Sequence, residues 1–295
     1  MAGSGATGVA TQIKAINGKC LYTHCKGQAL NLAVAESIKS VKCLKGVFEA
    51  ASEICKLVRK SPKRNVRLND LKKENQNDSK GIHEFCPTRW TVRGEALDAI
   101  LNSYYELMNL WDCFLETLSD TIMKARIRSV QKQMPIFDFL FGCSLGILIL
   151  RQTDNLSKTL QDSRMSAAKG NEIAQDVIKT LSKDRNNNSC NLFWEMVLRR
   201  KQYLDVDDPI LPRKRRLPRR LEDGNAETRH FPSTPKDHYR QIYLQALDTV
   251  TSCIKRRFDQ PDFRKYVCLQ EIFLKAIKDE PWENGIKEVC STFWQ

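Results

Sequence analysis

The stretch at residues 136–150, IFDFLFGCSLGILIL, constrains the fold most, because almost all of its side chains are apolar. Such a segment is stable only where other apolar groups shield it from water, in a protein core or in a membrane. A helix needs about 20 apolar residues to span a bilayer, and this stretch is shorter and contains Asp138. The sequence therefore predicts a buried core helix, and it predicts no membrane partner.

Helical spacing of apolar residues recurs on both sides of this stretch. Steps of three and four residues are found in segments 28–41, 43–60, 97–118, 121–182, 190–205, 238–259 and 266–280. The helix over 97–118 is expected to begin near Arg93 and to run without a break, whereas Pro135 is expected to separate two helices. A β-branched and aromatic run at residues 20–25 predicts a strand. The predicted fold class is mainly α with a small β element.

Two polar stretches divide the chain. Residues 61–81 are rich in turn-forming residues and predict a loop or a frayed helix end. Residues 206–238 combine several prolines with dense charge and predict a long extended connection. The expected organisation is an N-terminal unit at 1–60, a polar linker at 61–84, a helical domain at 85–205, a basic proline-rich linker at 206–238 and a C-terminal helical segment at 239–295.

The chain is basic, with a formal net charge of +13 and an isoelectric point of about 9.2. Such a charge favours polyanionic partners, of which nucleic acid is the commonest, and leaves acidic protein surfaces and plain solubility as alternatives. The densest basic block, at 212–220, suits phosphate contacts or nuclear import, and its alternative is a solvated loop. Its cations are Arg213, Lys214, Arg215, Arg216, Arg219 and Arg220. The expected location is the nucleus.

Local patterns that would carry catalysis or bind a metal are not found in the sequence. The four histidines stand in no arrangement with a nucleophile, and no phosphate-binding glycine loop follows a strand. The eleven cysteines are scattered singly, which argues against a disulfide framework or a zinc ribbon and favours reduced, buried thiols. His24 and Cys25 are adjacent on the predicted strand, so their side chains point to opposite faces and no shared metal ion is expected.

The motif FCPTRWTVRGEAL, at residues 85–97, sets a planar cation beside the largest aromatic residue at the start of a helix. One interpretation is a nucleic-acid contact, in which Arg89 binds phosphate and the Trp90 ring stacks on an unpaired base. The other interpretation is a structural anchor, in which the Trp90 ring is buried and Arg89 caps a local carbonyl. Spacing alone favours the anchor.

Four motifs follow one another in an order that resembles a known family. They are YTHCKGQALNLAV, CPTRWTVRGEAL, TDNLSKTLQ and a C-terminal set made of LPRKRRLPRRL, HYRQIYLQALDTV and RRFDQ. In this order, and over nearly the whole chain, they resemble hAT-superfamily transposases, especially the host-encoded copies in zinc finger MYM-type proteins.

The resemblance implies an RNase H-like fold with a large helical insertion. In that family two aspartates and a glutamate hold divalent metal ions such as Mg²⁺ for DNA strand cleavage and transfer. MAGSGATGV resembles the tail of the family's Asp-Gly-Ala-x-Asn-Met-x-Gly motif, and the Ser-Phe-Ser segment with the dimerisation helices has no counterpart. The resemblance therefore implies that the three catalytic carboxylates and the dimerisation segment are absent from this chain, and no cofactor is expected.

The resemblance also assigns individual residues. Arg89 and Trp90 match an Arg-Trp pair that lies close to the family's active site, where the tryptophan handles the distorted DNA end, and Arg93 joins them as a candidate DNA contact. The family's Cys-x-x-His step is Cys25-Lys-Gly-Gln28 here, so its histidine is replaced.

The expected function is that of a non-catalytic, transposon-derived nuclear protein that binds nucleic acid or other proteins. One alternative is a fragment of a metal-dependent transposase whose catalytic acids lie outside this chain. The other is a helical protein-interaction scaffold.

Overall fold

The fold is built from helices throughout the part of the chain that the structure describes. The computed structural model describes residues 8–22, 26–85, 91–160, 166–213, 232–282, 286–287 and 290. The twelve helices in these residues are α1 (Val9–Ile16), α2 (Lys26–Ser40), α3 (Lys42–Arg59), α4 (Pro62–Glu74), α5 (Thr91–Asn102), α6 (Tyr104–Thr117), α7 (Thr121–Gln133), α8 (Phe137–Leu160), α9 (Ala167–Asp184), α10 (Asn187–Leu204), α11 (Pro235–Phe258) and α12 (Pro261–Ile277).

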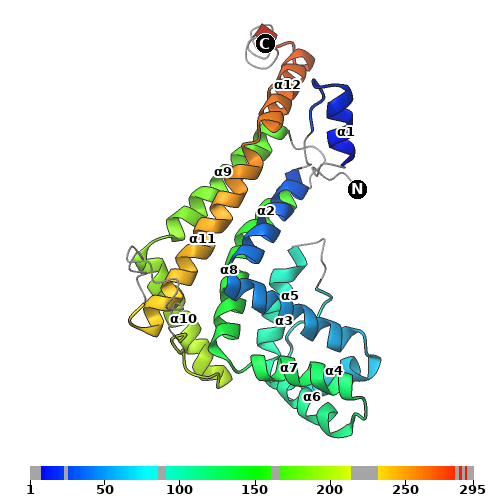
Figure 1. Cartoon of the computed structure of the whole chain (residues 1–295), viewed down its shortest axis with the longest axis vertical. Coiled ribbons are helices and arrows are strands. Elements are labelled where there is room, and N and C mark those ends of the chain that lie inside the picture. Colours follow the sequence, from blue (N-terminus) through cyan, green and yellow to red (C-terminus); the bar gives the residue numbers. More distant parts are fainter. Residues whose placement is uncertain are drawn as a thin grey trace, which may run out of the picture.

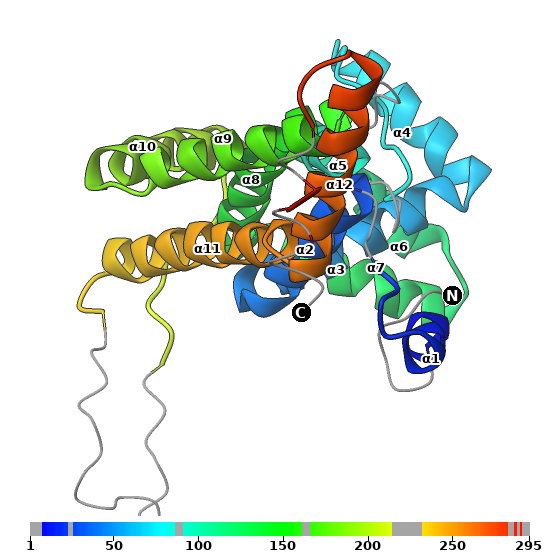
Figure 2. The ribbon, with the colours of Figure 1, turned by 90° about the horizontal axis from the view of Figure 1, so that it is seen from above.

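Helix α8 runs through the middle of the molecule and packs against α2, α3, α5, α9 and α10 (Figure 1). Helices α9, α10 and α11 extend to one side of it, and α3 to α7 gather on the other (Figure 2). Helix α11 packs against both α2 and α9, so it joins the N-terminal part of the chain to the C-terminal part. The apolar stretch in α8 is buried at the centre of this arrangement, which confirms the prediction of a core helix.

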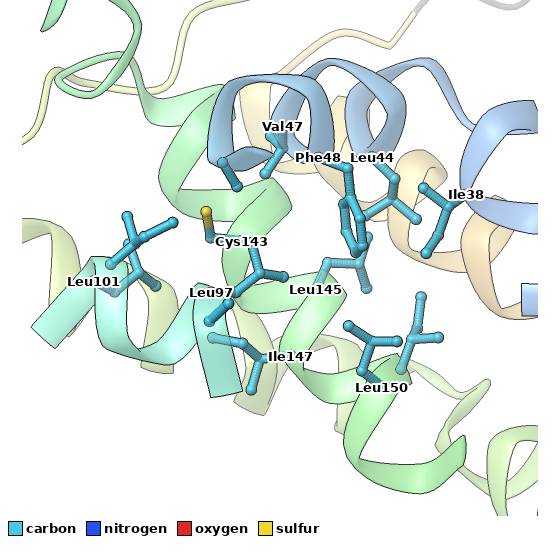
Figure 3. Packing of buried hydrophobic residues seen from close by; sticks show 14 of the residues in the cluster. Ile38, Leu44, Val47, Phe48, Leu97, Leu101, Cys143, Leu145, Ile147 and Leu150 are labelled. Atoms are coloured by element: carbon cyan, nitrogen blue, oxygen red, sulfur yellow. The ribbon is translucent and has the colours of Figure 1, made fainter. Parts of the chain in front are cut away.

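Figure 3 shows Val47 and Phe48 of α3 and Leu97 of α5 packed against α8, and two glycines of α8 allow this close approach. A methyl group on Gly142 would stand 2.5 Å from Cγ2 of Val47 in α3. A methyl group on Gly146 would stand 2.9 Å from Leu97 Cδ1 of α5 and 2.9 Å from Phe48 Cε2 of α3. Atoms do not approach this closely in a folded core, so the absence of a side chain at both positions sets the spacing of α3, α5 and α8.

Pro135 separates α7 from α8, as the sequence predicts. The two helices are bent by 79° at this break, because proline removes a backbone donor and its ring clashes with the preceding turn. Among the described residues no single helix is long and apolar enough to cross a membrane. Within the same described residues, one bent pair, α7 with the first part of α8, reaches that length and composition when the two helices are taken together.

The strand predicted at residues 20–25 is not found where the structure describes it. Residues 20–22 are irregular, residues 23–25 lie outside the described part, and no strand occurs among the described residues. A strand is stable only when a second strand supplies its hydrogen bonds, and the segments on both sides of this run are the helices α1 and α2. The fold is therefore mainly α, and the small β element is not found in the described residues.

The polar linker predicted at residues 61–84 was wrong for residues 62–74, which form α4. The Ser61 hydroxyl accepts a hydrogen bond from the backbone N–H of Arg64 at 3.4 Å, and Pro62 occupies the first helical turn. Both are helix-start features. The buried residues of α4 are Arg64, Leu68, Leu71 and Lys72. Two of these four are cations, so the inner face of the helix does not stand out as apolar in the sequence.

The helix predicted to run without a break over 97–118 is divided into α5 and α6 at Ser103, which lies in a turn. The side chain of Ser103 is fully buried. Both helices direct apolar residues into the same core, so the three-and-four spacing continues across the turn and conceals it.

Candidate functional site

A groove of about 920 Å³ lies in the angle between α2 and α3, and we call it the elbow groove. The two helices are joined by Val41, which has an extended backbone (φ −97°, ψ 109°) and is buried. Because a buried residue holds this joint, the angle between the two walls of the groove is fixed by the core. The groove is lined by Gln28, Asn31, Leu32, Ala35, Ile38, Lys39, Lys45, Phe48, Glu49, Ser52, Lys56, Phe85 and Arg93.

An aromatic and cationic cluster closes one side of the elbow groove. The rings of Phe48 and Phe85 meet edge to face, with their centroids 5.6 Å apart and an interplanar angle of 78°. The Arg93 guanidinium carbon lies 5.1 Å from the centroid of the Phe85 ring, within the range of a cation–π contact. Arg93 is only 9% exposed. Its charge is therefore held inside the wall of the groove.

Three lysines give the rim of the elbow groove its charge. Lys39, Lys45 and Lys56 are exposed, and none of them forms an ion pair within the described part of the chain. On α3 the residues 45, 49, 52 and 56 recur at helical spacing, so they share one face of the helix. Among the lining residues that the structure describes, Glu49 is the one carboxylate, against three lysines and Arg93. The groove is therefore cationic at neutral pH.

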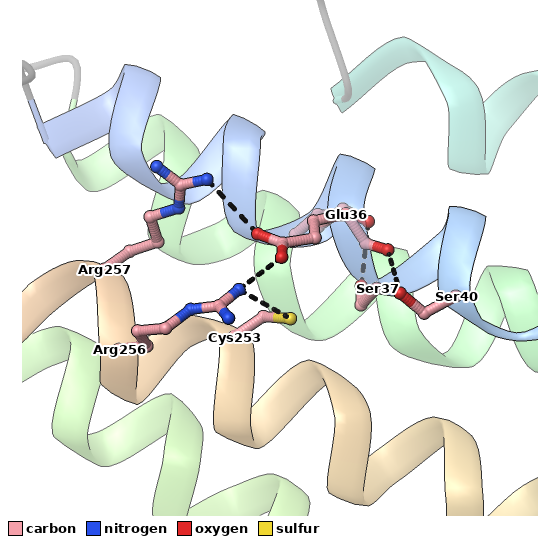
Figure 4. A network of polar contacts seen from close by, with 7 residues as sticks. Glu36, Ser37, Ser40, Cys253, Arg256 and Arg257 are labelled. Atoms are coloured by element: carbon pink, nitrogen blue, oxygen red, sulfur yellow. Dashed lines mark hydrogen bonds and ion pairs between the residues drawn. The ribbon is translucent and has the colours of Figure 1, made fainter. Parts of the chain in front are cut away.

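A cluster of charged side chains from α2 and α11 holds the α2 wall of the groove in place (Figure 4). The Glu36 carboxylate accepts hydrogen bonds from Arg256 and Arg257 of α11, the latter at 3.2 Å. The hydrogen bond from Arg256, assisted by Arg257, holds the pKa of Glu36 below its usual range. Because the two arginines are paired with Glu36, they tie α11 to α2. We call this cluster the Glu36 clamp.

The structure brings together two of the residues that the sequence singles out. Gln28, the position of the replaced histidine, and Arg93, the candidate DNA contact, both line the elbow groove. Cys25, Arg89 and Trp90 lie outside the described residues, so their predicted roles stay predictions.

The basic block is described only at its first cation. Arg213 is exposed and irregular, and the cations from 214 to 220 lie outside the described residues. Their predicted role in nuclear import stays a prediction.

The lysines of the rim and the two phenylalanines were missed by the sequence reasoning. Lys45 and Lys56 are eleven positions apart on the helix predicted at 43–60, which places them on one face. That spacing was available in the sequence. The approach of Phe85 to Phe48 was not, because it depends on how the segment before α5 folds back onto α3.

Burial makes two thiols of α3 poor nucleophiles. It raises the pKa of both the Cys43 and the Cys55 thiols to about 12, so both are protonated at neutral pH. The nine cysteines in the described residues are free thiols. In the same part of the chain no group of three or more His, Cys, Asp or Glu side chains is placed to hold a metal ion.

No protein-family model matches the chain, and no solved structure matches it.

Proposed function

We propose that this chain binds nucleic acid through the elbow groove. The observation that carries the proposal is the convergence of Lys39, Lys45, Lys56 and Arg93 on one groove, where the described lining residues include a single carboxylate. Cations gathered on a concave surface raise the local positive potential more than the same charges spread over the protein. The overall charge of +13 adds a long-range attraction for a polyanion.

The positions of the lysines suit a phosphate backbone. Lys45 and Lys56 are eleven positions apart on α3, which corresponds to about 16 Å at the helical rise per residue. This separation allows the two lysines to contact phosphates several nucleotides apart on one strand, since successive phosphates of one duplex strand advance by about 3.4 Å along the axis.

The proposal includes the origin of the chain. The order of the four motifs supports a transposon-derived protein of the hAT type with an RNase H-like fold, a nuclear location and no cleavage activity of its own. The presence of Gln28 and Arg93 in one groove adds to this, because the motif resemblance singles out both residues. Incubating the protein with a DNA hairpin and Mg²⁺ tests whether the chain cleaves DNA. Intact DNA is expected, and nicked or joined products would contradict the proposed lack of cleavage activity.

The binding proposal is tested by titrating a fluorescently labelled DNA hairpin at several salt concentrations. Each phosphate contact contributes about 0.9 to the slope of log K against log salt. Changing Lys39, Lys45 and Lys56 together to Glu is therefore expected to reduce the magnitude of the slope by up to about 2.7 and to weaken binding at low salt by about tenfold or more.

The matched control changes Arg128, Lys132 and Lys183 to Glu, since all three are exposed and lie outside the elbow groove. Both triple variants change the net charge by the same amount. The control is expected to retain most of the wild-type affinity. Equal losses in the two variants would show that only the overall charge matters, and no binding by the wild type at low salt would contradict the proposal.

A further inference from the structure

The floor of the elbow groove is apolar, although its rim is cationic. Phosphates need only the rim, because lysines that project into water bind them well. The floor is formed by Leu32, Ala35, Ile38, Phe48 and Phe85. A ligand that contacts both rim and floor therefore carries a negative charge and, a short distance from that charge, an apolar group that is flat or compact.

A nucleic-acid duplex cannot place such a group on the floor. Its bases are stacked on one another, so they present only their edges in the grooves. The groove volume of about 920 Å³ lies in the range of about 300–1,000 Å³ that encloses one small molecule. A whole duplex is wider than its own major groove of about 12 Å, so it would rest on the rim and leave the floor uncovered.

We propose that the elbow groove takes a single strand, with the backbone along Lys39, Lys45 and Lys56 and one unpaired base on the apolar floor. This inference rests on the proposed function, because it specifies which form of nucleic acid the same groove prefers. An unpaired base has two apolar faces and a phosphate on each side along the strand, which matches the arrangement of floor and rim. Gln28 and Asn31 place amide groups at the α2 wall, and amides can hydrogen-bond to base edges.

The test compares three labelled probes on the full chain: a thymidine strand, a strand of the same length with abasic sugars, and a duplex of that length. The stacking of one base is expected to make the thymidine strand bind about fivefold to 100-fold more tightly than the abasic strand. The duplex is expected to bind no more tightly than the abasic strand. All three affinities should fall as salt is raised.

A variant that fills the floor provides the second measurement. Ala35 is half-buried and lines the groove, so Ala35→Leu is expected to occupy the position of the base without changing the charge. The variant should bind the abasic strand as the wild type does and should lose the preference for the thymidine strand. Far-UV circular dichroism checks that the variant is folded.

The outcomes separate this inference from the proposed function. Equal, salt-dependent binding of all three probes would overturn the single-strand inference and leave nucleic-acid binding in place. No binding of any probe at low salt would overturn both. Displacement of the thymidine strand by a helical peptide rich in Glu and Leu, at lower concentration than unlabelled strand requires, would overturn the inference in favour of an acidic protein partner.

Discussion

The contact between α3 and α8 and the contact between α4 and α6 hold neighbouring helices together by opposite means. On the first, Val47 and Phe48 of α3 pack against two glycines of α8, which leave no room for a larger side chain. Next to the second, the buried Lys72 ammonium of α4 donates to three oxygens of the segment that follows this helix: the carbonyl of Ser79 at 3.2 Å, its hydroxyl at 3.0 Å and the carbonyl of Lys80 at 2.9 Å.

A buried carboxylate completes the polar contact. Glu106 is 4% exposed and accepts hydrogen bonds from the amides of Asn75 at 3.1 Å and Asn77 at 3.0 Å. Burial lowers the pKa of the Lys72 ammonium, and the negative charge of Glu106 opposes that shift. The apolar contact therefore depends on shape, whereas the polar contact depends on every partner being present.

The largest effect is expected on the polar side of this comparison. Lys72→Met keeps the length of the side chain but removes the donor that Ser79 and Lys80 share, and it leaves the buried Glu106 without its opposite charge. Removing one partner from a buried charged network costs about 3 kcal/mol. Urea unfolding followed by far-UV circular dichroism measures the loss in the free energy of unfolding.

Lys73→Met is the matched control, because Lys73 is the next residue of the same helix and is exposed. Its free energy of unfolding is expected to change by less than about 0.5 kcal/mol, as for most surface substitutions. Similar losses for the two variants would mean that the helix, and not the buried network, is sensitive to the change.

The second prediction concerns the apolar side. Gly142→Ala and Gly146→Ala each place a methyl group where atoms of α3 or α5 already lie, and overpacking of this kind costs about 2 kcal/mol. Gly46→Ala is the control: it lies within α3, nothing stands within 4 Å of the added methyl, and the change should stabilise the helix by about 0.5–1 kcal/mol. A lower unfolding temperature for Gly142→Ala and Gly146→Ala, together with a higher one for Gly46→Ala, would support the close-packing argument. A lower unfolding temperature for Gly46→Ala would contradict it.

The same difference explains how much of the fold could be predicted from the sequence. Apolar periodicity identified α2, α3 and α8, because their inner faces are made of residues that avoid water. It failed for α4, whose inner face includes Arg64 and Lys72. The Arg64 Nε donates to the carbonyl of Leu57 at 2.6 Å, a partner that only the folded chain provides. The signal that was available is Ser61 followed by Pro62, a helix start.

The elbow groove was partly predictable for the same reason. Gln28 and Arg93 were singled out from their motifs, and the lysines on α3 share a face by spacing alone. The joint at Val41 and the approach of Phe85 to Phe48 could not be predicted, because they depend on contacts between segments that are distant in sequence. Local patterns show which side chains share a helix face, and tertiary packing determines which faces meet.

The last and smallest prediction concerns a charged contact that is exposed to solvent, the Glu36 clamp. In the Glu36 clamp the side chains of Arg256, Glu36 and Arg257 are 60%, 37% and 26% exposed. The pKa of Glu36 is lowered from its ordinary value of 4.5. The clamp therefore stabilises the fold fully above that value, and its contribution is lost as the pH falls through the lowered pKa.

Solvent screening limits the contribution of the Glu36 clamp to less than about 1 kcal/mol. Glu36→Gln should lower the free energy of unfolding by that small amount at neutral pH and by nothing at a pH well below 4.5. Glu116→Gln, at an exposed position on α6, is the control, and its free energy of unfolding at neutral pH is expected to change by less than about 0.5 kcal/mol. The Glu36 clamp and the Lys72 network are both charged, and they differ mainly in their exposure to water. If Glu36→Gln lowered the free energy of unfolding at neutral pH as much as Lys72→Met does, burial would not be what makes a polar contact indispensable.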